Sequence, residues 1–181
     1  MRLSPHPSDP VRVTVAHPED YAEIAAVNEA AYTEYRPVLG EAVWAPMRAN
    51  ITAVAEAAKA AVLLAARGDD GVLGSVLYYP PGTSLPPLPP EYASIRTLAV
   101  APRARGRGVG AALMQACIER ARAEGADRLW LYTTEMMSSA VALYERLGFV
   151  RDAEMPPRHG QRCWSYRLDL GTAGGEATPA R

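Results

Sequence analysis

Hydrophobic and polar residues alternate along several short stretches of the chain, and this period of two predicts β-strands with one buried face. The clearest stretch lies near the C-terminus, where Trp164, Tyr166 and Leu168 alternate with Ser165 and Arg167. Runs of similar length recur from the N-terminus onward. The sequence predicts strands over residues 11–16, 61–67, 72–79, 95–100, 129–133 and 163–170, and from residue 149 onward.

Hydrophobic residues spaced three or four positions apart predict amphipathic helices between these strands. The first helix opens at Pro18, whose ring suits a first helical turn, and we expect Pro37 to end it. A later helix has Leu113 and Cys117 on its apolar face and should stop at Gly125. We expect helices over residues 18–35, 40–58, 107–124 and 138–147.

Proline dominates one connection, residues 80–90, with six prolines in eleven positions. Because proline fixes φ and lacks an amide donor, this stretch should be a loop. It is either a stiff surface connection or one wall of an acceptor pocket.

The order of these elements predicts one α/β (mixed α+β) domain over residues 11–170. Its twisted mixed sheet should have six to seven strands, flanked by helices on both faces. We expect a flexible N-terminus over residues 1–10 and a disordered C-terminal tail over residues 171–181.

The composition of the chain argues against several classes of function. The chain has 181 residues and a net charge of −1, so no overall field favours nucleic acid or a membrane. Two cysteines 46 residues apart, Cys117 and Cys163, favour packing roles over a metal site, and we expect no metal. No signal peptide or membrane-length apolar run is evident, which predicts a cytoplasmic protein, either monomer or homodimer.

A glycine- and arginine-rich loop joins the strand ending at Val100 to the next helix. Gly106, Gly108 and Gly110 alternate with larger residues where the helix begins. Glycine allows close approach of a ligand to the backbone, and a helix N-terminus offers unpaired amides and a partial positive charge. Arginine side chains at positions 103, 105 and 107 suit phosphate groups. The loop therefore predicts a pyrophosphate site.

One alternative for this loop is the dinucleotide-binding motif, which Gly106-x-Gly108-x-x-Ala111 also fits. In that motif the first glycine follows the strand almost directly. Here residues 101–105, including Pro102, intervene, and the cluster of arginines fits a nicotinamide dinucleotide poorly.

Two motifs resemble the GNAT superfamily of acetyl-CoA-dependent N-acetyltransferases. Arg103-x-x-Gly106-x-Gly108, after a strand that ends in Leu-Ala-Val, resembles its acetyl-CoA-binding motif. A second segment, residues 140–149, resembles its other motif, a helix that carries Leu-Tyr and ends in Gly-Phe. The resemblance is close over residues 92–152 and implies the GNAT fold, with acetyl-CoA as the acyl-donor substrate.

The resemblance also implies roles for particular residues. The strand end at residues 98–100 would bind the pantetheine arm and polarise the thioester through its backbone. Ser138 or Ser139 would replace an asparagine that many members carry where this chain has Met137. The implied cofactor-binding residues are Leu98, Ala99, Val100, Arg103, Arg105, Gly106, Arg107, Gly108, Val109, Gly110, Ala111 and Ser138.

Tyr144 occupies the Leu-Tyr position, which implies that it is the general acid facing the CoA sulfur. A free thiol has a pKa of about 8.5 and a phenol about 10, so a hydrogen bond to the departing sulfur would be the larger part of its role. The alternative is a tyrosine packed in the core beside Val141 and Leu147.

The general base is less defined. An amine of the lysine type, with a pKa of about 10.4, is almost fully protonated at pH 7, so a carboxylate acting directly or through water is the usual solution. Ser94 stands where some family members have a glutamate. The candidate bases are Glu91 and Glu135, followed by Glu34 and then His159.

Two functions remain open at this stage. The first is an N-acetyltransferase that acts on a primary amine of a small molecule or peptide. The second is a non-catalytic module that binds or senses acyl-CoA. Several aromatic residues either line an acceptor pocket or belong to the core: Tyr32, Tyr35, Trp44, Tyr78 and Tyr79.

Overall fold

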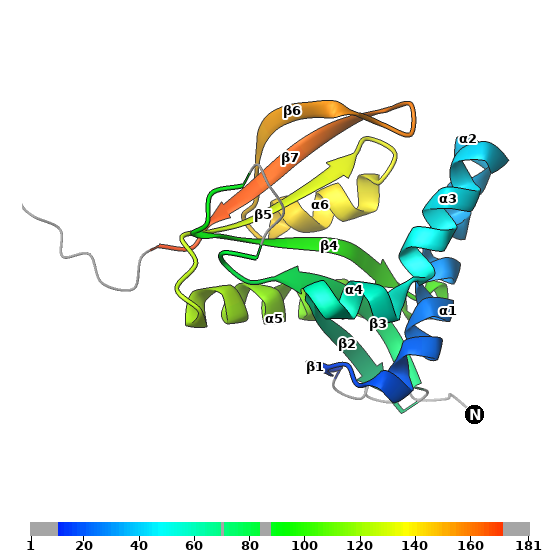
Figure 1. Ribbon diagram of the computed structural model, residues 1–181, viewed down its shortest axis with the longest axis horizontal. Coiled ribbons are helices and arrows are strands. Elements are labelled where there is room, and N and C mark those ends of the chain that lie inside the picture. The colour runs from blue at the N-terminus through cyan, green and yellow to red at the C-terminus, as the bar shows by residue number, and fades with distance from the viewer. Residues whose placement is uncertain (1–10, 70, 84–87, 172–181) are drawn as a thin grey trace, which may run out of the picture.

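Seven strands form a single sheet in the order β1-β2-β3-β4-β5-β7-β6. The computed structural model describes residues 11–69, 71–83 and 88–171 (Figure 1). All neighbouring strands are antiparallel except β4 and β5, which are parallel. The strands are β1 (Arg12–Val15), β2 (Val62–Gly68), β3 (Gly71–Tyr79), β4 (Tyr92–Val100), β5 (Arg128–Thr134), β6 (Val150–Arg158) and β7 (Gln161–Asp169).

Helices cover both faces of the sheet, as predicted. Gly74 of β3 faces Leu113 of α5, whereas the next residue, Ser75, faces Asn28 of α1 on the opposite side. The helices are α1 (Tyr21–Tyr32), α2 (Arg36–Leu39), α3 (Glu41–Thr52), α4 (Val54–Ala60), α5 (Val109–Ala123) and α6 (Ser138–Arg146). Short 3₁₀ turns occupy Pro18–Asp20, Thr33–Tyr35 and Pro102–Ala104.

The centre of the sheet opens between β4 and β5. These strands pair only over Tyr92–Ser94 and Arg128–Trp130, after which they diverge (Figure 1). A bulge in β4 adds to this change of direction, because the register with β3 shifts where Thr97 has a φ of 52°. A positive φ is costly for a residue with a β-branched side chain, and strained residues of this kind cluster at functional sites. The wedge between the strands exposes the backbone of β4 on one edge.

Helix α1, which packs on β3 and β4 beside this opening, is held by buried hydrogen bonds. Asn28 of α1 donates to the carbonyl oxygen of Ile51 in α3 (2.9 Å) and accepts from the hydroxyl of Ser75 in β3 (2.7 Å). All of these groups lie in the interior, where an unpaired partner would be costly. These hydrogen bonds therefore fix the separation of α1, α3 and the sheet.

The N-terminal helical region differs from the prediction in two places. Pro37 does not end the helical path: it lies at the start of α2, where its missing amide costs little, and Gly40 (φ 72°) ends that turn instead. The single helix expected over residues 40–58 is two helices, because the chain bends at Ala53 (φ −75°, ψ 51°) between α3 and α4.

The predicted tails, residues 1–10 and 172–181, lie outside the described residues, as do residues 84–87 of the proline-rich loop. Residues 80–83 and 88–90 are neither helix nor strand, as expected. Within the described ranges, no helix combines the length and apolar character needed to cross a membrane.

Substitutions at Gly74 test how closely α5 packs on the sheet. A Cβ atom added there would lie 2.6 Å from the carbonyl oxygen of Ala99 and 3.1 Å from side-chain atoms of Leu113 and Val109. We expect Gly74→Ala to lower the free energy of unfolding by about 1–3 kcal/mol through overpacking. Gly74→Val should lower it further. Chemical denaturation measures both effects.

The control for that series is Ala153→Val, which enlarges an exposed side chain on the edge strand β6. It should leave the free energy of unfolding within about 0.5 kcal/mol of the original value. Equal stability of the Gly74→Val protein and the unmodified protein would contradict the packing described here.

Candidate active site

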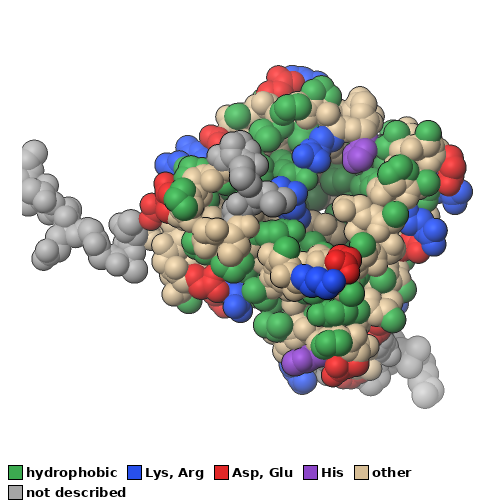
Figure 2. All heavy atoms as spheres, viewed as in Figure 1, with side chains coloured by type: hydrophobic (Ala, Val, Ile, Leu, Met, Phe, Trp, Pro, Cys, Tyr) green, Lys and Arg blue, Asp and Glu red, His purple; other side chains and the backbone are tan. Residues whose placement is uncertain are grey.

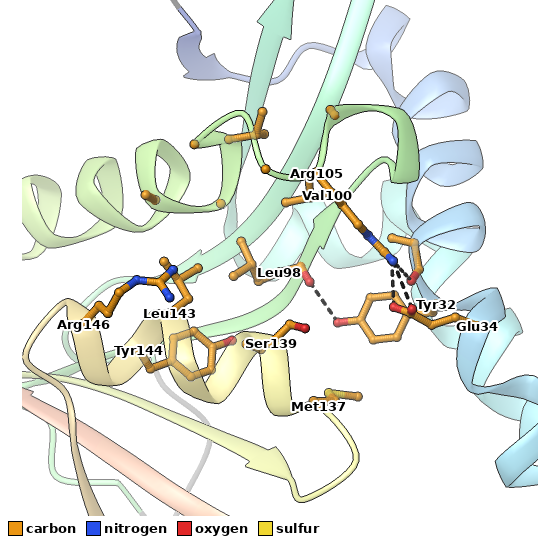
Figure 3. A pocket seen from close by; sticks show the side chains of 18 of the residues that line it. Tyr32, Glu34, Leu98, Val100, Arg105, Met137, Ser139, Leu143, Tyr144 and Arg146 are labelled. Atoms are coloured by element: carbon orange, nitrogen blue, oxygen red, sulfur yellow. Dashed lines mark hydrogen bonds and ion pairs between the residues drawn. The ribbon is translucent and has the colours of Figure 1, made fainter.

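A cavity of about 550 Å³ lies where the ends of α1 and β4, the start of α5 and one face of α6 meet (Figure 3). Most of the predicted cofactor-binding residues line it: Leu98, Val100, Arg105, Gly106, Gly108, Val109, Gly110 and Ala111. Tyr144 also lines it. Ala99 does not, because consecutive side chains of a strand point to opposite faces; it is buried on the other side of β4.

The start of α5 forms one wall of the cavity. Gly106 (φ 74°) and Gly108 (φ 77°) both adopt left-handed conformations, and Gly108 is the N-cap, directly before the first residue of α5. The first helical amides, those of Val109, Gly110 and Ala111, have no carbonyl one turn earlier to which they can donate. They therefore give this wall donors and a partial positive charge, which suit an anion.

The three arginines of the loop differ in what they contact. Arg105 lines the cavity but pairs with Glu34 (2.7 Å) and donates to the carbonyl of Ala31 (3.1 Å). Arg103 donates to the carbonyl of Val72 (3.0 Å) and, like the exposed Arg107, is not part of the cavity lining.

The face of α6 that borders the cavity carries a residue that sequence analysis missed. Arg146 lies in the last turn of this helix and lines the cavity, together with Ser139 and Leu143 (Figure 3). Helical spacing was the available signal, because positions 139, 143 and 146 share one face. Ser138, the neighbour chosen from the sequence, instead lies beside a separate hollow next to Glu135 and Trp164.

Tyr144 is buried with 6% of its surface exposed. Its ring packs against Phe149 (5.9 Å between centroids) and Tyr166 (6.3 Å). The ring therefore belongs to the core, and its edge also lines the cavity. Burial raises the pKa of Tyr144 well above its ordinary value, and the nearby Tyr35 and Cys117 add to the effect.

Tyr32 links this cavity to a second one. Its hydroxyl donates to the carbonyl oxygen of Leu98 (3.2 Å), next to the bulge of β4 (Figure 3). Burial raises its pKa, and the phenols of Tyr144, Tyr35 and Tyr132 contribute further. Sequence analysis named Tyr32 only as one of five aromatic residues and had no signal for its contact with β4.

The second cavity, of about 430 Å³, shares Tyr32 and Met137 with the first. Its walls come from α3, the bulge of β4, the end of β5 and the turn between β6 and β7. The lining residues are Tyr32, Pro46, Met47, Asn50, Ile51, Arg96, Thr97, Tyr132, Thr133, Thr134, Met137, Arg158 and His159. Among the described residues, this lining contains no carboxylate.

The two carboxylates that the sequence favoured as general bases lie far from each other and away from the two cavities. Glu91 precedes β4 and lies beside Asp127 and Arg128, seven residues, or roughly 20 Å of strand, from Leu98. Glu135 pairs with Arg162 (3.3 Å) in the hollow behind α6. Neither borders the two joined cavities.

Glu34 and His159 do border them. Glu34 lines the first cavity but is engaged by Arg105 through both carboxylate oxygens. His159 lines the second cavity from the turn after β6. The other aromatic residues considered for an acceptor pocket lie in different places. Tyr35 lines the first cavity, Trp44 and Tyr78 are buried, and Tyr79 borders a hollow beside α4.

Residues 22–149 match the model of the acetyltransferase (GNAT) family. The match covers more than half of the chain, and the protein belongs to this family. The resemblance seen in the glycine loop and the Leu-Tyr helix is thereby confirmed, as is the predicted fold.

The chain is similar to the mycothiol acetyltransferase of Salinispora arenicola, with 46% identity over 63 residues, which are 34% of this chain and 20% of that protein. Streptothricin acetyltransferase of Streptomyces lavendulae is 41% identical over 56 residues, which are 31% of this chain and 30% of that protein. The matched segments therefore span less than a third of either relative.

A solved structure similar in fold is that of yncA from Salmonella typhimurium with its cofactor acetyl-CoA. The two chains align with a TM-score of 0.63 and 19% identity, over 93% of this chain and 99% of that one. Acetyl-CoA is the acyl donor of the GNAT family.

The raised pKa of Tyr144 gives a direct test of its environment. At pH 10 an ordinary phenol is about half ionised. We expect the phenolate absorbance of the unmodified protein and of Tyr144→Phe to be equal at this pH, because burial keeps the Tyr144 phenol protonated. A difference equal to half a phenolate would show that Tyr144 is solvated.

Proposed function

We propose that this protein transfers the acetyl group of acetyl-CoA directly to a primary amine of a small molecule or peptide, within a ternary complex. The observation that carries the proposal is the meeting of two cavities at Tyr32 and Met137, beside the bulge of β4. One cavity suits the donor and the other the acceptor. A direct transfer needs both substrates in contact at such a junction.

The first cavity fits acetyl-CoA. The amides of Val109, Gly110 and Ala111 would hold the pyrophosphate, with Arg146 as the nearby guanidinium that has no carboxylate partner among the described residues. The edge of β4 beyond Ser94, released from β5, would bind the pantetheine arm through its backbone. The position of Ser139 favours it over Ser138 for the contact that Met137 cannot make.

In the proposed reaction, the amine nitrogen attacks the carbonyl carbon of the thioester. A carbon–nitrogen bond forms, the carbon–sulfur bond breaks with its electron pair on sulfur, and the amine loses one proton. Because burial raises the pKa of Tyr144, its phenol is a poor proton donor toward a thiolate whose conjugate thiol has a pKa of about 8.5. Its role is therefore a hydrogen bond to the departing sulfur.

For the proton of the amine, His159 is the base that the second cavity supports best, because its imidazole lines this cavity and the described lining has no carboxylate. Arg96 and Arg158 line the same cavity, and their positive charge favours the neutral form of an amine bound elsewhere in it. The positions of Glu91 and Glu135 argue against their participation.

The names of the relatives, mycothiol acetyltransferase and streptothricin acetyltransferase, agree with a small-molecule acceptor. The alternative, a module that binds acyl-CoA without catalysis, predicts binding of acetyl-CoA but no release of CoA thiol with any amine.

Donor binding is tested by calorimetric titration with acetyl-CoA, CoA and NADH. We expect both CoA species to bind and NADH not to bind. Gly108→Trp should abolish binding of CoA, because the indole would project from the residue that opens α5 into the phosphate wall.

The matched control for this titration is Gly125→Trp at the other end of α5. Both glycines have a left-handed φ, 77° and 72°, and an added Cβ meets nothing within 4 Å at either position. The backbone strain is therefore similar. Equal loss of binding in both variants, or binding of NADH by the unmodified protein, would overturn the assignment of the donor cavity.

Tyr144→Phe tests the assisted departure of sulfur. Loss of the hydroxyl should lower kcat about tenfold or more while leaving the Kd of acetyl-CoA within about twofold, since the hydrogen bond is strongest in the transition state. Thiol release measures kcat, and calorimetry measures Kd. A proportional change in both would assign Tyr144 to packing alone.

A further inference from the structure

The second cavity contains two arginine side chains stacked on one tyrosine ring, an arrangement that the proposed function does not by itself require. The ring of Tyr132 in β5 is contacted by two guanidinium groups, that of Arg158 at 4.4 Å from the ring centroid and that of Arg96 at 5.2 Å. Arg96 also lies over the ring of Tyr79 at 5.8 Å. These stacks hold both side chains in place without neutralising their charge.

These two arginines differ from most other arginines of the described chain because they have no carboxylate partner. At least eight arginines of the described chain have a carboxylate within 4 Å: Arg36, Arg48, Arg67, Arg105, Arg120, Arg128, Arg162 and Arg167. Within the described residues, Arg96 and Arg158 have no such partner, and the lining of their cavity includes no acidic side chain. A guanidinium pair of this kind is suited to bind an oxyanion bidentately.

The position of the pair relates it to the reacting centre. Arg96 precedes Thr97, the bulge residue, and is two residues, or roughly 7 Å of strand, from Leu98, whose carbonyl oxygen accepts from Tyr32. Arg158 reaches the same ring from the end of β6, on the opposite wall. In Figure 2 this face is hollowed between α3 and the β6–β7 hairpin, and basic side chains border the hollow.

From these observations we infer that the acceptor is an amine that also carries a carboxylate, such as a free amino acid, and that Arg96 and Arg158 bind this carboxylate. The inference rests on the proposed acetyltransferase function and narrows its substrate class. The carboxylate is held at Tyr132, and the amine extends toward Tyr32 and Met137, where the cavities join. A polycation is disfavoured as acceptor because no acidic residue of the described lining would balance its charge.

Matched ligands test the inference without knowledge of the natural acceptor. The panel contains the standard L-amino acids, β-alanine and 4-aminobutyrate, each beside its primary carboxamide, which keeps the amine and removes the negative charge. Aminomethylphosphonate and O-phosphoethanolamine serve as amines that carry other anions. Calorimetry of the protein saturated with CoA measures binding, and thiol release from acetyl-CoA measures turnover.

We expect at least one amino acid to bind with an affinity tenfold or more above that of its carboxamide, and to be acetylated with a correspondingly lower KM. Arg96→Gln and Arg158→Gln should each raise this KM about tenfold or more and reduce the preference for the acid over the amide, because one charge-assisted contact is lost. Arg96→Lys should retain part of the preference. The Kd of acetyl-CoA should not change.

The control variant is Arg151→Gln. Arg151 also stacks on aromatic rings, those of Trp164 (4.7 Å) and Tyr166 (5.8 Å), but it borders the hollow behind α6 rather than the acceptor cavity. It should leave the KM of the amino acid unchanged. Equal effects of Arg151→Gln and Arg158→Gln would indicate that the arginines act through stability, which overturns the inference.

The remaining outcomes distinguish failure of the carboxylate assignment from failure of the proposed acetyltransferase function. Carboxamides bound as tightly as acids, or phosphonate and phosphate amines bound more tightly than all carboxylates, would overturn the carboxylate assignment while leaving an acetyltransferase. Binding of no panel acid to the CoA complex would overturn it as well. Failure of acetyl-CoA itself to bind would instead refute the proposed function, and the first titration of the series detects it.

Discussion

The separation of β4 from β5 is the constraint on which the rest of the site depends. Two parallel strands in the middle of a sheet normally satisfy one another's backbone groups along their whole length. Here the pairing stops after Ser94 and Trp130, and the bulge at Thr97 turns β4 further away. The polar backbone edge that results is available to a ligand, and α5 and α6 are positioned around it.

The same opening explains why two cavities meet at one point. The proposed donor cavity follows the edge of β4 toward the start of α5, and the proposed acceptor cavity lies on the other side of the bulge, under α3 and the β6–β7 hairpin. Tyr32 stands between them and is held by the carbonyl of Leu98. The bridge of Asn28 to Ser75 and Ile51 sets the distance of α1 and α3 from the sheet, so the buried polar contacts of the N-terminal half determine the shape of the acceptor side.

The charges on the two sides are organised by different means. On the proposed donor side, positive potential comes from the start of α5 and from Arg146, since Arg105 is neutralised by Glu34 and Arg103 contacts the backbone of β3. On the acceptor side it comes from guanidinium groups stacked on Tyr132. A chain with a net charge of only −1 thus has two local basic regions at its candidate site.

The sequence by itself determined most of the elements, their order and the glycine loop before α5. These features depend on local rules, such as alternation in strands, helical spacing and the need for glycine at left-handed positions like Gly108. It also led to Tyr144, through a short motif. It did not reveal the contacts of the loop arginines or the positions of Glu91 and Glu135 relative to the cavities, because the direction and partners of a long charged side chain depend on residues far away in the chain. The contacts of Arg105 with Glu34, of Tyr32 with Leu98, and of Arg96 and Arg158 with one ring join segments more than 20 residues apart. Only the tertiary structure decided these contacts, since they exist only once α1, β4 and the β6–β7 hairpin are packed around the opening in the sheet.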